Sequence, residues 1–395
     1  INLIMNFDII IIGAGPSGLA LACSLSKTNL KIAVVEKLPR VSFSKPQYDG
    51  REIALTHRSV KILKKIGAWS FIPSSSISLV KEARIKDGTS AYFLHFDHKK
   101  TNRDSLGYII SNQEIRKALF KKFKKISNVK LFINSEVFSI VNNKSFATVN
   151  LSNKKILKSS LVVAADGRLS KIRKKKGISS NIKDFGTTMI VCKMKHKKKH
   201  NNIAYEFFHY SQTIAILPLK EKLSSVVITS PENDSRNLLK MNKNKFSKKI
   251  FTWLNGFLGK MELVSDQYEY PMITVHANQF YKDRFAVIGD AAVGMHPVTA
   301  HGFNLNLRGI DILTKEIKFA LNEKNNIGSS IVLNSYEKKF RKITMSMYLA
   351  TNNIVKLYTN QSFPAKIVRK TVLRLGNIIW PIKNAIMDEL LIKNS

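Results

Sequence analysis

The sequence predicts an α/β fold in which a parallel-sheet domain is interrupted by a β-rich insertion and followed by a helical C-terminal region. Residues 7–12 form an unbroken apolar run, which is typical of a strand buried on both faces of a parallel sheet. Residues 78–106 alternate aromatic with polar side chains, and residues 187–270 are again rich in strand-forming runs, which indicates a second sheet. The last part of the chain, from about residue 331, is basic and has helical spacing.

The composition is that of a folded but strongly basic chain. It has 395 residues, with 65 Lys and Arg against 27 Asp and Glu, and a formal charge of +38. A hydrophobic content of 44% excludes a disordered protein, and the two cysteines, Cys23 and Cys192, are expected to be buried thiols in a reducing cytosol. Because Lys far outnumbers Arg, we attribute the charge to the composition of the proteome. The alternative is a surface that binds polyanions, for which anionic lipid is a candidate.

No segment has the pattern of a membrane span or of a signal peptide. The most apolar stretch, residues 9–23, is interrupted by three glycines and a proline, and no basic region precedes it. Since the first residue is Ile, we expect the natural chain to start at Met5 and leave open whether residues 1–4 belong to it.

The first strand opens a βαβ unit that carries a glycine motif. Gly13, Gly15 and Gly18 follow it and precede an Ala- and Leu-rich helix, and the next apolar strand ends at Glu36. These glycines suit a tight turn, the approach of a pyrophosphate to the backbone, and close packing of helix on strand. The helix start offers free N–H groups to that pyrophosphate, and Glu36 lies where a carboxylate accepts ribose hydroxyls. We therefore predict a Rossmann-like, dinucleotide-binding domain, with an ordinary βαβ turn as the alternative.

The remaining elements divide the chain into segments that return to this domain. Residues 113–125 are predicted to be a helix, residues 129–163 strands, and residues 285–288 a further buried strand. The predicted boundaries are 1–77, 106–186 and 276–330 for the dinucleotide-binding domain, 78–105 and 187–275 for the β-rich domain, and 331–395 for the helical region.

Two further segments place glycine beside polar residues after an apolar strand. Residues 164–173 read AADGRLSKIR, and the strand at 284–288 ends in Gly289 and Asp290 before a loop and a helix that begins near Gly302. The glycines allow close backbone approach, Asp290 can accept hydroxyl donors, and the start of the helix attracts an anion. Each segment alone fits an ordinary loop, but three such segments in one chain favour a bound dinucleotide.

The sequence resembles a known family at these positions. GAGPSG, ADGRLSKIR and GDAAVGMHPVTAHGFN are similar to the three motifs of the single-component flavin aromatic hydroxylases. DGREIAL at 49–55 and LGYII at 106–110 narrow the resemblance to the ubiquinone-biosynthesis hydroxylases of the UbiH/UbiF/UbiM type, nearest to the UbiM branch. It covers essentially the whole chain, and it implies an FAD-binding domain of the aromatic hydroxylase type with an inserted β-rich substrate domain and a helical C-terminal tail.

The resemblance also implies which residues bind FAD. Asp290 would hold the ribityl chain, Gly302 and its two successors would face the flavin, and Asp166 and Gly167 would serve both FAD and reduced nicotinamide. The complete implied set is Gly13, Gly15, Gly18, Glu36, Arg51, Arg116, Asp166, Gly167, Gly289, Asp290, Gly302, Phe303 and Asn304.

The candidate catalytic residues lie in the loop before Gly302. They are His296, Pro297 and His301, which could contact the substrate or the flavin ring. We expect an apolar lining that excludes water from Pro297, Val298, Phe303 and the strand that carries Phe207 and Phe208.

Other chemistries have little support. His196 and His200 are four residues apart, but they lie in a Lys-rich run that repels a metal ion, so a solvated loop and no metal site are expected. The chain has no GxSxG, HExxH or Walker motif, so nothing indicates a hydrolase or an NTPase. The basic runs at 171–176 and 193–200 lack the motifs of nucleic-acid binding, and no nucleic-acid partner is expected.

The expected activity is hydroxylation of a polyprenylated phenol or quinol by FAD, O2 and NAD(P)H or another electron donor. The alternatives are a flavin-dependent reductase of prenyl lipids and a non-catalytic FAD-binding subunit. The predicted location is cytoplasmic, attached peripherally to the inner membrane through the basic amphipathic tail, with other ubiquinone-biosynthesis proteins as potential partners.

Overall fold

A computed structural model describes residues 4–87, 93–209, 212–296, 302–359 and 362. A six-stranded sheet forms the centre of the first domain, in the order β20-β21-β13-β2-β3-β9, and it is parallel except for the antiparallel edge strand β20. Its strands β2, β3, β13 and β21 are buried along their whole length, as their unbroken apolar runs predict. The bounds are β2 Ile9–Ile12, β3 Ile32–Val35, β9 Val129–Phe132, β13 Leu161–Ala164, β20 Tyr281–Lys282 and β21 Phe285–Val287.

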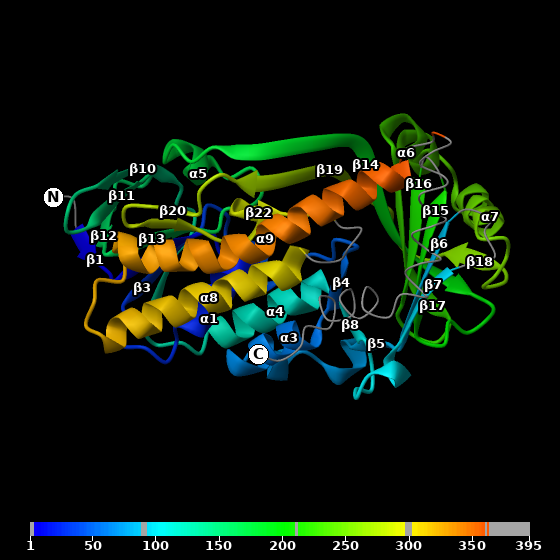
Figure 1. The fold of residues 1–395 in the computed structure, drawn as a ribbon, viewed down its shortest axis with the longest axis horizontal. Coiled ribbons are helices and arrows are strands. Elements are labelled where there is room, and N and C mark those ends of the chain that lie inside the picture. The colour runs from blue at the N-terminus through cyan, green and yellow to red at the C-terminus, as the bar shows by residue number, and fades with distance from the viewer. Residues whose placement is uncertain (1–3, 88–92, 210–211, 297–301, 360–361, 363–395) are drawn as a thin grey trace.

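Four helices pack together beside this sheet (Figure 1). Helix α1, Pro16–Ser24, contacts both α4, Asn112–Phe123, and α8, Gly302–Asn322, while α8 packs on α9, Ser330–Thr359. Their apolar side chains and the sheet form one continuous core, which includes Cys23. The other helices of this part are α2 Val41–Ser44, α3 His57–Lys65 and α5 Lys171–Lys175.

Two small sheets flank the first domain. A four-stranded sheet, in the order β1-β12-β11-β10, lies at the end marked N in Figure 1, and a three-stranded antiparallel sheet, β4-β8-β5, lies on the side of the second domain. The bounds are β1 Ile4–Asn6, β10 Val137–Asn142, β11 Ala147–Leu151, β12 Ile156–Ser159, β4 Glu52–Leu55, β8 Gly107–Ser111 and β5 Ser78–Val80.

A nine-stranded sheet forms the β-rich domain. Its main order is β22-β19-β14-β17-β16-β15-β6-β7, and β18 pairs with β14. The residues around 82–97 therefore join the same sheet as the later strands, as the alternation predicts. The bounds are β6 Glu82–Asp87, β7 Phe93–Asp97, β14 Ser180–His196, β15 Ile203–His209, β16 Gln212–Pro218, β17 Leu223–Pro231, β18 Met261–Leu263, β19 Tyr268–Ala277 and β22 Val293–Gly294.

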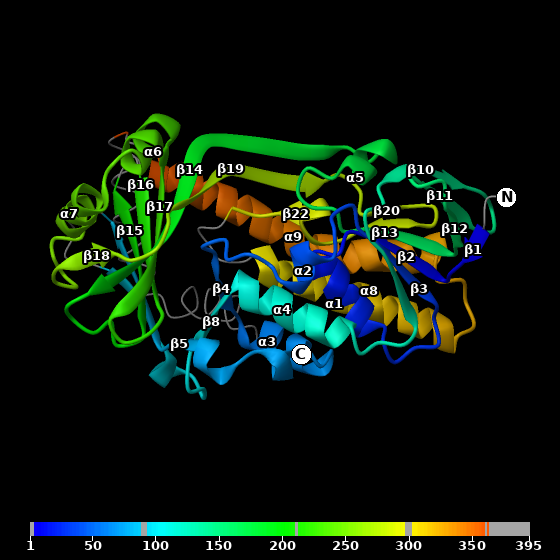
Figure 2. The same cartoon turned by 180° about the vertical axis from the view of Figure 1, so that it is seen from behind.

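Strands β14 and β19 connect the two domains. They pair antiparallel and run from the first domain to the far sheet, as both views show (Figures 1 and 2). Their pairing is irregular between Asp184 and Thr188, where Gly186 has a φ of 62°. The boundary that we place between residues 186 and 187 thus falls at a bulge inside β14.

Two helices interrupt the segment at 187–270 that is predicted to be rich in strands. Helices α6, Glu232–Leu239, and α7, Lys243–Trp253, cover one face of the large sheet, and their apolar residues pack with Cys192 and Phe207. Cys23 and Cys192 are both free and buried, so the expectation of buried thiols is confirmed, and this burial raises the pKa of each to about 12.

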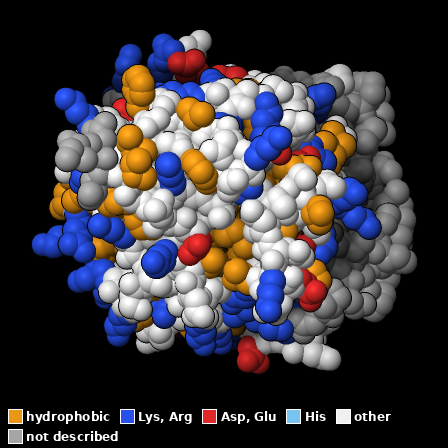
Figure 3. Space-filling model, turned by 90° about the vertical axis from the view of Figure 1, so that its left-hand side faces the viewer, with side chains coloured by type: hydrophobic (Ala, Val, Ile, Leu, Met, Phe, Trp, Pro, Cys, Tyr) orange, Lys and Arg blue, Asp and Glu red, His pale blue; other side chains and the backbone are white. Residues whose placement is uncertain are grey.

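On one face of the molecule the positive charge is distributed rather than concentrated. Lys and Arg side chains are spread over the face in Figure 3, among hydrophobic side chains and few acidic ones. Within the described ranges, no helix is both long enough and apolar enough to cross a bilayer.

Candidate active site

The glycine motif forms the turn between β2 and α1. Gly13 has a φ of 107°, and a Cβ there would lie 2.5 Å from the Ala165 carbonyl oxygen, while a Cβ on Gly18 would collide with the Gly13 carbonyl. A Cβ on Gly15, by contrast, would meet no protein atom within 4 Å. Gly13 and Gly18 are therefore required by packing within the chain, whereas the space beside Gly15 is open for a ligand.

The first turn of α1 is suited to an anion. Gly15 is its N-cap residue and supplies no side-chain hydrogen bond, and the first turn holds no acidic residue. The exposed N–H groups and the helix dipole favour a pyrophosphate at this position. The Glu36 carboxylate lies beside the turn, because it accepts hydrogen bonds from the N–H groups of Ala14 at 2.7 Å and Leu38 at 2.9 Å.

Asp290 is held on the opposite side of the same turn by two side chains. Asn306 of α8 donates to its Oδ1 at 2.8 Å, and Arg168 forms an ion pair with its Oδ2 at 3.3 Å. Asp290 remains about one-third exposed, so its carboxylate keeps acceptor capacity for a ligand hydroxyl. Gly289 packs against Ser17, which brings the Asp290 loop next to α1.

A buried arginine supports this loop. The guanidinium of Arg173 is fully enclosed and donates to the Ala291 carbonyl at 2.7 Å and to the Ser180 hydroxyl at 2.9 Å. Asp166 caps α5, which carries Arg173, by accepting from the Ser170 hydroxyl and from the Ile172 N–H at 3.2 Å. The carboxylate of Asp166 is thus engaged within its own loop, while a Cβ on the adjacent Gly167 would meet nothing within 4 Å.

The start of α8 is tied to the three-stranded sheet. The Asn304 carboxamide donates to the Ala54 carbonyl at 2.8 Å and accepts from the Thr56 N–H at 3.0 Å. Phe303 packs against the core of the first domain, and the space beside Gly302 is open. Asn304 therefore positions the helix start against β4.

The loop that carries Arg51 contacts the large sheet. Arg51 pairs with Asp49 at 2.6 Å and lies over the ring of Tyr270, whose hydroxyl donates to the Asp49 carbonyl at 2.5 Å. Although desolvation opposes it, hydrogen bonds from Arg51 and Asn112 lower the pKa of the Asp49 carboxyl. Arg116 donates to the Ser42 carbonyl at 2.8 Å and adds positive charge to the same region.

A second ion pair joins the same loop to β14. The Glu52 carboxylate accepts from Lys193 at 3.1 Å and from the Tyr48 hydroxyl at 3.1 Å, and its side chain is only 4% exposed. Burial raises the pKa of Glu52, and burial together with the neighbouring carboxylates raises the pKa of Tyr48. Glu52 and Lys193 lie far apart in the sequence, and no local motif predicts their pairing.

His296 directly precedes Pro297 and is the first of the candidate catalytic residues in the loop before Gly302. Its ring is buried and makes an edge-to-face contact with Phe185 at 4.9 Å between centroids. Burial, with help from Arg168 and Lys183, lowers its pKa to about 4, so the imidazole is neutral near pH 7. Pro297, Val298 and His301 lie outside the described residues.

Comparisons with known proteins agree with this geometry. Residues 6–350 match the family described as FAD binding domain. The chain is 42% identical over 390 residues to the ubiquinone hydroxylase UbiM of Neisseria meningitidis, covering 98% of this chain and 85% of that relative. It is 27% identical over 380 residues to the ubiquinone hydroxylase UbiL of Rhodospirillum rubrum, covering 96% and 88%.

The chain belongs to this FAD-binding family, together with the ubiquinone hydroxylases. Its fold is also that of the p-nitrophenol 4-monooxygenase PnpA of Pseudomonas putida, with a TM-score of 0.78, 17% identity and coverage of 99% and 100%. PqsL of Pseudomonas aeruginosa, a probable FAD-dependent monooxygenase, aligns with a TM-score of 0.77, 16% identity and coverage of 90% and 97%.

The residues present fit the FAD that the family binds. The open space beside Gly15, Gly167 and Gly302 would admit a ligand, and Glu36 and Asp290 supply carboxylates on two sides of the α1 N-terminus. Arg168, Arg173 and Asn306, which orient the Asp290 loop, were not predicted as site residues. The signal for the two arginines was their place in the ADGRLSKIR motif of this family.

Two sequence-based expectations are wrong. His196 and His200 are buried rather than solvated, and their ring nitrogens bond the Lys198 carbonyl at 2.6 Å and the Lys220 carbonyl at 2.6 Å. His196 is the last residue of the long strand β14 and is part of the sheet. The lysines on either side of it give this stretch the composition of a solvated loop. Phe207 packs under α7 on the far face of the sheet, so only Phe208 of that pair faces away from these helices.

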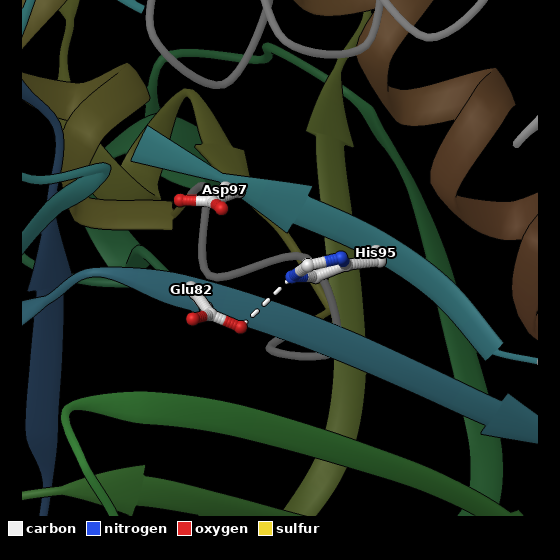
Figure 4. A group of neighbouring side chains, drawn as sticks. All are labelled: Glu82, His95 and Asp97. Atoms are coloured by element: carbon white, nitrogen blue, oxygen red, sulfur yellow. Dashed lines mark hydrogen bonds and ion pairs between the residues drawn. The ribbon is translucent and has the colours of Figure 1, made fainter. Parts of the chain in front are cut away.

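One cluster outside this site has the composition of a metal site. Ligand atoms of Glu82, His95 and Asp97 lie within 4.8 Å of one another on β6 and β7 (Figure 4). The same Glu82 oxygen accepts from Arg84 at 2.8 Å and from His95 at 2.8 Å, and these bonds lower the pKa of Glu82 although desolvation opposes them. A metal ion would have to displace the Arg84 guanidinium, so we assign the cluster to ion pairing.

The Asp290 carboxylate offers a direct test of the cofactor site. Replacement of Asp290 by Ala is expected to weaken FAD binding by ~1.5–3 kcal/mol, roughly tenfold to a hundredfold in Kd, because a ligand hydroxyl loses a charged acceptor. Fluorescence titration of the apoprotein with FAD measures the change. Asp234→Ala, at an acidic position in the first turn of α6, is the matched control. Equal affinity in the wild type and Asp290→Ala would contradict the assignment.

Proposed function

We propose that this protein is an FAD-dependent monooxygenase that hydroxylates the aromatic ring of a polyprenylated phenol or quinol in ubiquinone biosynthesis. The observation that carries the proposal is the 42% identity to a ubiquinone hydroxylase across nearly the whole chain. Bound FAD supplies the redox chemistry, in which NAD(P)H or another donor provides the electrons and O2 provides the oxygen atom.

The described residues would bind and orient rather than transfer protons. The α1 N-terminus, Glu36 and Asp290 would hold the dinucleotide, and Arg51 and Arg116 would balance its negative charge. The start of α8, held against β4 by Asn304, would direct its positive end at the developing negative charge on the ring system. A phenol or quinol ring is already electron-rich, so the reaction needs no strong general base.

An isotope experiment tests the reaction type. Turnover of a short-chain prenylated phenol under oxygen-18 gas, followed by mass spectrometry of the product, is expected to show the label in the new hydroxyl group. A parallel reaction in oxygen-18 water under ordinary air is the control and should give unlabelled product. A hydroxyl group derived from water would mean that the protein is not a monooxygenase.

We further propose that the protein attaches peripherally to a membrane, on the cytoplasmic side of the inner membrane. The support is the formal charge of +38, which anionic lipid attracts, and a substrate class whose prenyl chain resides in the bilayer. The basic amphipathic tail that we expect to anchor the chain extends from about residue 354 to Lys383, and its part after Ser362 lies outside the described residues.

Truncation after Ser362 tests this anchor. The shortened chain is expected to lose most of its co-sedimentation with vesicles that contain anionic phosphatidylglycerol, because it loses most of the basic amphipathic tail. FAD content and circular dichroism establish that it remains folded. Unchanged sedimentation would assign membrane attachment to another surface or exclude it.

A further inference from the structure

One face of the nine-stranded sheet carries a row of side chains that cross five strands and continue onto β6 and β7. Residues directly opposite each other in neighbouring strands point to the same face. Val191 pairs with both Tyr268 and Val227, Ala215 pairs with Val227, and Glu206 pairs with Ala215. On its other side Glu206 pairs with Ile85, which pairs with Leu94. We call this set the transverse row: Tyr268, Val191, Val227, Ala215, Glu206, Ile85 and Leu94.

The transverse row faces the FAD-binding domain. Tyr268 at its end packs against Gly50 and stacks edge-to-face on Tyr48 at 5.6 Å between centroids, both in the loop that carries Arg51. Lys193, two residues along β14 from Val191 and therefore on the same face, pairs with Glu52. The opposite face, with Phe207 and Cys192, is covered by α6 and α7.

Glu206 carries the carboxyl group of the transverse row, and the other members of the row are apolar except for Tyr268. Its neighbours on the same face are Phe208, which is buried, and Thr213, whose hydroxyl donates a hydrogen bond to the carboxylate. Burial raises the pKa of Glu206 to about 8 against the effect of that bond, so the carboxyl is mostly protonated near pH 7. A protonated carboxyl both donates and accepts a hydrogen bond.

The transverse row offers no cation to a negatively charged ligand. The row contains no Lys or Arg, and the nearest lysine on this face of β14, Lys193, is paired with Glu52. Arg84, next to Ile85 on β6, belongs to the opposite face, where it lies over the ring of Tyr205 and bonds Glu82. A ligand carboxylate beside Glu206 would have to share the single proton of that carboxyl group, and no cation of the described row would offset the negative charge that the pair retains in an apolar wall.

We propose that Glu206 selects a neutral phenol or quinol ring by exchanging a hydrogen bond with a ring hydroxyl, and that it rejects rings bearing a carboxylate. This inference rests on the proposed function, because it concerns the substrate of the same site. It makes Glu206 a specificity-determining residue through both an attractive contact and a repulsive one.

Two probes that differ in one carboxylate test the selection. They are 2-prenylphenol and 4-hydroxy-3-prenylbenzoate, titrated into the FAD-loaded full chain by calorimetry. The wild type is expected to bind the phenol at least ~10-fold more tightly, which corresponds to about 1.4 kcal/mol. Glu206→Gln keeps a hydrogen-bonding group without the ionisable carboxyl, and it is expected to reduce this preference several-fold, mainly by tighter binding of the acid.

Glu206→Leu tests the attractive contact separately. It is expected to weaken binding of the phenol by about tenfold, since the ring hydroxyl loses its partner in an apolar wall. Glu221→Gln is the matched control, because Glu221 is an exposed glutamate of the same domain, paired with Lys199, and should change neither affinity. FAD content and circular dichroism show that each variant is folded, and either Glu206 variant alone suffices to test the proposal.

The outcomes separate this inference from the proposed function. If the wild-type protein hydroxylates the phenol and both Glu206 variants keep the wild-type affinities, the role of Glu206 is overturned and the proposed function is not. If the FAD-loaded wild-type protein binds neither probe and yields no product, both the proposed function and this inference are overturned. A reduced preference in Glu206→Gln, together with unchanged affinities in Glu221→Gln, supports the proposal.

Discussion

Replacement of Gly15 by Val is expected to abolish FAD binding and leave the chain folded. Gly15 has an ordinary φ of −68°, and a Cβ there meets no protein atom, so the larger side chain costs the apoprotein little. The same side chain fills the open space beside the first turn of α1, where the pyrophosphate must approach the backbone N–H groups. The purified variant should lack the yellow absorption of bound FAD while its thermal unfolding stays cooperative.

Gly18 provides the matched comparison within the same motif. A Cβ there collides with the Gly13 carbonyl, so Gly18→Val is expected to disrupt the packing of α1 on β2 and to unfold the domain or prevent its accumulation. The two variants thus separate a glycine needed by the ligand from one needed by the fold. Retention of stoichiometric FAD by Gly15→Val would contradict the assignment of the open space to the cofactor.

Replacement of Arg173 by Met is expected to lower the free energy of unfolding by about 3 kcal/mol and to weaken FAD retention as well. The guanidinium joins three elements, since it lies on α5, donates to Ala291 in the loop of Asp290, and donates to Ser180 at the start of β14. Met fills much of the volume but leaves the carbonyl and the hydroxyl without their charged donor. Urea unfolding followed by circular dichroism measures the first effect, and FAD titration measures the second.

A surface arginine serves as the control for this variant. Arg236 on α6 is exposed and pairs with Glu232 four residues earlier, so Arg236→Met is expected to change the free energy of unfolding by less than about 0.5 kcal/mol. If Arg173→Met is no less stable than Arg236→Met, the bonds to Ala291 and Ser180 do not support the Asp290 loop.

The parts of the site that local sequence predicts are those built within one βαβ unit or one loop. The Gly13–Gly18 turn, the position of Glu36 after β3, and the Gly289–Asp290 corner after β21 all depend on residues close together in the chain, and the structure places them around the α1 N-terminus. The residues that orient them were not predicted. Arg168 reaches Asp290 across 122 positions, and Arg173 reaches Ala291 across 118.

The errors have the same origin. The Lys-rich run at 193–200 has the composition of a solvated loop, yet β14 carries its histidines into the sheet, where backbone carbonyls accept their hydrogen bonds. The residues of α6 and α7 were predicted to be part of a strand-rich segment. Their apolar side chains form the buried face of each helix, and this face is recognised only once the sheet that it covers is known.

The sequence by itself determined the parallel α/β core, the dinucleotide turn and the family, because unbroken apolar runs and positionally constrained glycines act over a few residues. Only the tertiary structure decided which face of the large sheet meets the FAD-binding domain and which side chains share it. Strand alternation alone does not distinguish the two faces of the sheet. In the structure, β14 and β19 bring one face against the loop that carries Arg51, and the ion pair between Glu52 and Lys193 joins that loop to β14. Glu206 therefore lies on the sheet face that meets the FAD-binding domain and Phe207 lies on the opposite face, because consecutive residues of a strand point in opposite directions.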